Sequence, residues 1–150
     1  MDVDVTMLAD IRRPRAEVAA FASDPRNAPR WYANIRSVEV LTDGPVGVGS
    51  RMRFVATFLG RTIDYTYEVV ELVPGERMTM TTGSGPFPMT TTYVFEDLGT
   101  GSTRMSLRNH GSPSGFGAVA APVMRVAMQR AVTKDLRALT RLLEAGGPRR

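Results

Sequence analysis

The fold is decided by the stretch GFGAVAAPVMRVAMQRAVTKDLRALTRLLEA, residues 115–145. Apolar side chains recur in it at steps of three and four residues, the spacing that places them on one face of a helix. The stretch therefore predicts one long amphipathic helix, whose apolar face needs another element to cover it. The apolar face comprises Ala121, Met128, Val132, Leu136, Leu139 and Leu143, and the opposite face carries Arg130, Lys134, Arg137 and Arg141.

Arg125 interrupts the apolar face of this predicted helix. It lies three residues before Met128 and seven before Val132, so it should point where the leucines point. Burying an unpaired guanidinium costs several kcal/mol, roughly, so Arg125 needs water, a carboxylate or a ligand. We therefore predict that Arg125 holds a ligand or pairs with an acid. The alternative is that Pro122 shifts the helix phase and leaves Arg125 solvated.

The residues before the helix predict strands, because apolar and polar side chains alternate there with a period of two. The first alternating run covers residues 2–12, and two short helical segments follow it, after Pro14 and within residues 27–35. Six further runs follow, separated by short turns rich in glycine and proline. They comprise residues 38–40, 51–58, 62–69, 77–81, 89–96 and 104–109.

The connections between these strands indicate the architecture. Short connections between successive strands predict antiparallel neighbours, and one apolar face per strand predicts a sheet covered on one side. The long helix is the only element large enough to cover that side. We expect a single α+β domain, residues 1–150, in which a curved seven-stranded antiparallel sheet surrounds a long C-terminal helix, with two short helices after the first strand.

The composition excludes several classes of function. There is no cysteine and only one histidine, His110, so disulfides, thiolate sites and His-rich metal sites are excluded, and we expect no metal and no cofactor. The basic residues are scattered despite a net charge of +4, which argues against nucleic-acid binding. No apolar run approaches the ~18 residues of a membrane span, and the N-terminus does not resemble a signal peptide. We expect a cytoplasmic monomer or homodimer without stable membrane insertion.

Several short motifs follow one another in a particular order and spacing. They are Pro14–Val18 before Phe21, Asp24-Pro25, Pro29–Tyr32, Gly44–Arg51, Tyr67–Glu71 before Pro74–Arg77, Tyr93–Glu96 and Gly101–Arg104. Together with the final helix they resemble the SRPBCC, or START-like, superfamily, and in particular its polyketide cyclase/dehydrase-like branch. The resemblance covers essentially the whole chain. It implies the helix-grip fold of the major birch-pollen allergen, with an elongated apolar cavity whose mouth is formed by the two short helices and the loops at 83–89 and 111–116.

The inward-facing positions of the strands and helix predict the lining of that cavity. Methionines would give a soft lining that accepts varied apolar ligands, although ordinary core packing explains any single one. Hydroxyl groups beside them would orient an amphipathic ligand, unless each tyrosine simply bonds a backbone carbonyl. Similarly, the only tryptophan either seals the short helices against the sheet or contacts a ligand. The predicted ligand-binding residues are Trp31, Met52, Phe54, Phe58, Tyr65, Tyr67, Met78, Met80, Met89, Thr91, Tyr93, Met105, Leu107, Asn109, Met124, Arg125 and Met128.

Two functions compete on this basis. The first is binding of a hydrophobic or amphipathic small molecule, lipid- or polyketide-like, because no complete catalytic constellation is present. The second is a polyketide cyclase/dehydrase-type enzyme, in which Arg125 stabilises an enolate and Tyr65, Tyr67 or His110 moves protons. A third reading, a chaperone-activator-like interaction protein, would need an exposed partner surface that the sequence does not identify.

Overall fold

The computed structural model describes residues 3–82, 88–112 and 121–146, which form a single antiparallel sheet with helices against it. The sheet has seven strands in the order β1-β7-β6-β5-β4-β3-β2. The predicted α+β helix-grip class is confirmed. In chain order the elements are β1 (Val3–Ile11), α1 (Arg15–Ala22), the 3-10 turn η1 (Pro25–Asn27), α2 (Ala28–Trp31), β2 (Ile35–Val40), β3 (Arg51–Phe58), β4 (Arg61–Val73), β5 (Arg77–Thr82), β6 (Met89–Gly99), β7 (Ser102–Gly111) and α3 (Ala121–Gly146).

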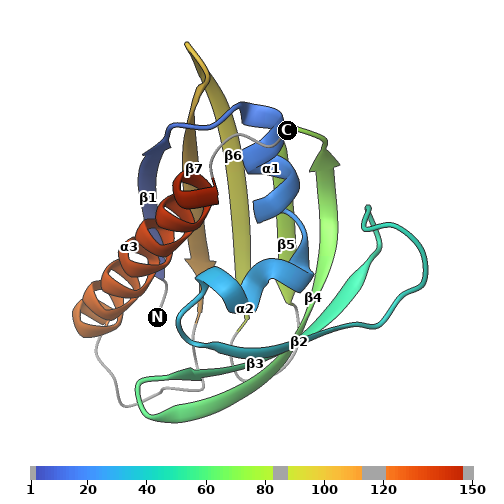
Figure 1. Cartoon of the computed structure of the whole chain (residues 1–150). Coiled ribbons are helices and arrows are strands. Elements are labelled where there is room, and N and C mark those ends of the chain that lie inside the picture. Colours follow the sequence, from blue (N-terminus) through green and yellow to red (C-terminus); the bar gives the residue numbers. More distant parts are fainter. Residues whose placement is uncertain (1–2, 83–87, 113–120, 147–150) are drawn as a thin grey trace.

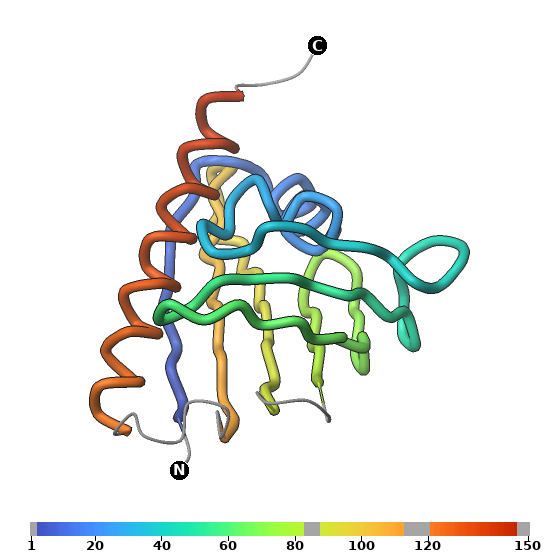
Figure 2. The backbone as a smooth tube through the Cα atoms, turned by 90° about the horizontal axis from the view of Figure 1, so that it is seen from below, coloured from blue at the N-terminus to red at the C-terminus, as the bar shows by residue number. Residues whose placement is uncertain are grey.

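The sheet curves strongly around the helices. Figure 2 shows that β2 and β3 run across the direction of β1 and β7, so the sheet partly encloses a space. The long helix α3 lies beside β1, and α1 and α2 lie on the same side of the sheet (Figure 1). A register shift between Val69 and Glu71, where β4 pairs with β5, marks a bulge, which bends a strand. The bulge interrupts the alternation of side chains and explains why the sequence predicted β4 to end at residue 69.

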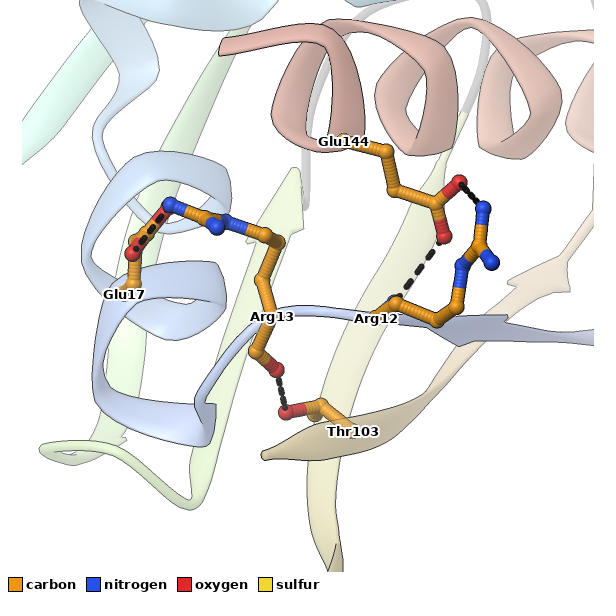
Figure 3. A network of polar contacts seen from close by, with 5 residues as sticks. All are labelled: Arg12, Arg13, Glu17, Thr103 and Glu144. Atoms are coloured by element: carbon orange, nitrogen blue, oxygen red, sulfur yellow. Dashed lines mark hydrogen bonds and ion pairs between the residues drawn. The ribbon is translucent and has the colours of Figure 1, made fainter. Parts of the chain in front are cut away.

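A network of hydrogen bonds connects α3, α1 and β7 to Arg12 and Arg13, the two residues that follow β1. The Arg12 backbone N–H donates to the Glu144 carboxylate of α3 at 2.9 Å, and the Arg13 guanidinium donates to Glu17 of α1 at 2.8 Å (Figure 3). The Thr103 hydroxyl of β7 donates to the Arg13 carbonyl at 2.8 Å. The Arg12–Glu144 contact thus joins α3 to the end of β1, and the Thr103–Arg13 contact joins β7 to the segment before α1.

The core lies between the concave face of the sheet and α3. The predicted apolar face of the helix is confirmed from Met128 onward, since Met128, Val132, Leu136, Leu139 and Leu143 are all buried. The predicted start of the helix, at 115–120, lies outside the described residues, as do most of the two predicted mouth loops. Among the helices of the described ranges, none combines the length and apolar character needed to cross a membrane.

Candidate ligand cavity

A cavity of about 140 Å³ lies between the concave face of the sheet and the helices. Side chains of β2 to β7 form one wall, and residues of the α1–α2 region and of α3 form the other. Eleven of the seventeen predicted ligand-binding residues line it. They are Phe54, Phe58, Tyr65, Tyr67, Met78, Met80, Met89, Thr91, Tyr93, Asn109 and Met128.

Five other predicted residues face inward but do not line the cavity. Each is at most 1% exposed and packs in the core, so the prediction that these side chains line the cavity is wrong. Strand alternation shows only that a side chain points to the concave side, whereas the sheet curvature determines whether it meets the cavity or a neighbour. These residues are Trp31, Met52, Met105, Leu107 and Met124. The Trp31 ring packs against Tyr32 and Tyr93, so it supports the wall from behind.

The prediction that Arg125 lines the cavity is wrong, because Arg125 is exposed. The buried face of α3 follows Met124, Met128, Val132 and Leu136 in steps of four residues. Each such step turns about 40° around the helix axis, so the buried face spirals along the helix. At the N-terminal end it is centred on Met124, about 100° from Arg125.

His110 also lies away from the cavity. It follows Asn109, which lines the cavity, and successive residues of a strand point to opposite faces. On the outer face, the pKa of Asp4 is lowered mainly by its hydrogen bond from Arg108, and the nearby charges of His110 and Arg125 add to the shift. His110 is therefore not placed to act as a general base on a ligand in the cavity.

Asp135 of α3 is a candidate site residue that the sequence analysis did not name. Only 3% of it is exposed, and it lines the cavity. Its Oδ1 accepts a hydrogen bond from the Ala33 backbone N–H at 2.9 Å. Burial raises the pKa of Asp135 to about 7, an effect that this hydrogen bond and the charge of Lys134 partly oppose. The carboxyl can thus exchange a proton near neutral pH.

All four tyrosines of the chain line the cavity, and three of them belong to hydroxyl pairs or chains. The hydroxyl oxygens of Tyr32 and Tyr93 are 2.5 Å apart. The Thr91 hydroxyl donates to Asn109 Oδ1 at 2.6 Å, so it accepts from the Tyr67 hydroxyl at 2.6 Å. Within the described part of the chain, no hydrogen bond reaches the hydroxyl of the fourth, Tyr65.

Burial keeps these tyrosines neutral. It raises the pKa of Tyr67 to about 12, an effect partly opposed by the hydrogen bond with Thr91, and it raises the pKa of Tyr32, Tyr65 and Tyr93 as well. At neutral pH they are therefore hydrogen-bonding groups without charge. Across the described ranges, no group of three or more histidine, aspartate or glutamate side chains is placed to hold a metal ion.

Comparisons with known proteins agree on the fold. The sequence profile of a family described as "Polyketide cyclase / dehydrase and lipid transport" matches residues 2–144. No curated protein matches the sequence.

Solved structures resemble the whole chain. The protein TTHA0849 from Thermus thermophilus is 24% identical with a TM-score of 0.80, and the match covers 97% of this chain and 99% of that one. The START superfamily protein from Mycobacterium smegmatis is 16% identical with a TM-score of 0.80, covering 95% and 97%. The ZhuI aromatase/cyclase from Streptomyces sp. R1128 is 16% identical with a TM-score of 0.79, covering 99% and 100%.

Proposed function

The chain belongs to the polyketide cyclase/dehydrase and lipid transport family, and on this premise we propose that it binds a hydrophobic or amphipathic small molecule in the cavity between the sheet and α3. The observation that carries the proposal is the lining itself. Methionine and aromatic side chains surround the space, and a few buried polar groups point into it. Ligand sites typically combine a mostly apolar wall with a small number of placed polar groups.

The apolar part of the lining favours a ligand without a rigidly matched shape. Met78, Met80, Met89 and Met128 border the cavity, and methionine side chains adapt to irregular surfaces because they are unbranched and polarizable. The aromatic rings of Phe54 and Tyr65, stacked with centroids 5.6 Å apart, offer a flat surface beside them. This combination suits a compact ring or a short chain.

A substitution that fills the cavity tests the proposal. Ala131 of α3 lines the cavity, and Ala131→Phe should reduce the affinity for the neutral fluorescent probe N-phenyl-1-naphthylamine at least tenfold. Ala145→Phe places the same side chain on an exposed position of the same helix and should leave probe binding unchanged. If folded Ala131→Phe binds the probe as tightly as the wild type does, the cavity is not the binding site.

A second candidate, a cyclase/dehydrase-type enzyme, is favoured by Asp135. A carboxyl with a pKa of about 7 is well matched to proton transfer at neutral pH, and Tyr65 has a hydroxyl open to a ligand. In this candidate Asp135 moves the proton, a role that the sequence suggested for Tyr65, Tyr67 or His110. Incubation with a reactive poly-β-ketone, which also cyclises without protein, distinguishes the two functions. An enzyme should change the rate or the products of cyclisation relative to a protein-free control, and Asp135→Asn should return both to that control while the variant still binds neutral apolar probes.

A further inference from the structure

The described lining of the cavity contains one acidic side chain and no basic one. Asp135 is the sole carboxyl among the described lining residues, and none of those residues is a lysine, arginine or histidine. The cations of α3 are placed elsewhere, since Arg125, Arg130, Lys134, Arg137 and Arg141 are exposed. An anionic ligand would therefore enter a low-dielectric space without a counter-charge.

The Asp135 carboxyl keeps one oxygen for a ligand. Its Oδ1 accepts from the Ala33 N–H, whereas no hydrogen bond from the described residues reaches Oδ2. Because the side chain lines the cavity, Oδ2 is available to a group bound there. A hydroxyl or amine can donate to the ionised carboxylate, and the protonated carboxyl can donate to a hydroxyl oxygen. A ligand carboxylate beside the ionised Asp135 would instead place two like charges in a buried site.

We propose that this cavity selects its ligand by charge: it takes compact neutral molecules whose hydroxyl hydrogen-bonds to Asp135, and it disfavours carboxylates such as fatty acids. The inference rests on the proposed binding function and specifies the ligand class of the same site. The volume of about 140 Å³ is consistent with a compact molecule, since an apolar cavity of about 150 Å³ accommodates benzene.

The discrimination should depend on pH through Asp135. The groups that interact electrostatically with Asp135 are Tyr32 directly after α2, Tyr65 of β4, Tyr93 of β6 and Lys134 of α3 itself. Burial keeps the three tyrosines neutral in this range, and Lys134 is exposed. With a pKa of about 7, Asp135 changes from mostly protonated at pH 6 to mostly ionised at pH 8. The affinity for a carboxylate should therefore fall roughly tenfold between these pH values.

Calorimetric titration with three matched probes tests the inference. Propylbenzene reports on the apolar cavity alone, 4-propylphenol adds a neutral hydroxyl, and 4-propylbenzoate adds a charge that persists at both pH values. We expect the wild type to bind the phenol at least tenfold more tightly than the benzoate at pH 8, with a smaller gap at pH 6. Asp135→Asn, which keeps an oxygen for the Ala33 N–H, should bind the benzoate equally at both pH values. The exposed Asp43→Asn should behave like the wild type.

Each other outcome has a defined meaning. If propylbenzene and the phenol bind and the benzoate binds the wild type equally well at pH 8, charge selection is overturned while the proposed binding function stands. If folded Asp135→Asn retains the wild-type discrimination and pH dependence, Asp135 is not the selecting group and the inference fails. If none of the three probes binds the wild type, both the proposed function and the inference built on it are wrong.

Discussion

Aspartates on the two sides of the sheet have pKa values shifted in opposite directions. On the outer face, Asp4, Asp10 and Asp64 each accept two hydrogen bonds from an arginine on the neighbouring strand, and these bonds lower their pKa. On the inner side, Asp135 has a backbone N–H as its only hydrogen-bond donor within the described chain, and burial raises its pKa to about 7. An exposed aspartate with an arginine partner stays ionised, whereas a buried one without such a partner becomes a group that titrates near neutral pH.

The largest expected effect comes from removing the inner charge. Asp135 binds a proton more tightly in the folded chain than in the unfolded chain, so its contribution to stability is present at low pH and is lost as pH rises from about 4 to about 7. The free energy of unfolding of Asp135→Asn relative to the wild type should therefore be roughly 4 kcal/mol higher at pH 8 than at pH 4. Urea unfolding at the two pH values measures this difference. A gain that does not change with pH would mean that the Asp135 carboxyl has an ordinary pKa.

The hydroxyl pair inside the cavity should give the next largest effect. Tyr93→Phe leaves the Tyr32 hydroxyl without its partner 2.5 Å away, and an unsatisfied buried hydroxyl costs about 1–3 kcal/mol. Adding Tyr32→Phe removes the orphaned group, so the double variant should lose less stability than the two single variants together. Tyr65→Phe is the matched control, because its hydroxyl donates to no described residue. Additive losses in thermal unfolding would show that the two hydroxyls do not interact.

The smallest effect is expected on the outer face. Asp10 and Arg104 form an exposed pair in which water can replace either partner, so Asp10→Asn should lower the midpoint of thermal unfolding only slightly. Salt should weaken the pair further, and the difference from the wild type should shrink at high ionic strength. A loss as large as that of Tyr93→Phe would contradict the contrast between the two faces.

Much of the candidate site was predictable, and the main error has a physical cause. Alternation along β4, β6 and β7 placed Tyr65, Thr91, Tyr93 and Asn109 on the concave side, where the structure has them lining the cavity. The helix spacing correctly predicted a charged residue on the buried face of the helix, but the residue chosen, Arg125, is exposed.

Asp135 carried the same spacing signal as Arg125. It lies seven residues after Met128, three after Val132 and four before Leu139, so a polar residue on the buried face was visible in the sequence. The same spacing rule identifies Asp135 when it is applied to the whole helix and not only to its N-terminal end. Its pairing with the Ala33 N–H, 102 residues away along the chain, could not be found this way.

The sequence by itself determined the elements, their order and the side of each strand that faces the core, because these follow from local periodicities of two and 3.6 residues. The tertiary structure alone decided which inward-facing side chains line the cavity and which charged residue of α3 is buried. Both depend on how far the sheet curves and on the angle at which α3 crosses it, and these are set by packing between residues distant in the chain. The same helix therefore exposes Arg125 to solvent and places Asp135 against the cavity.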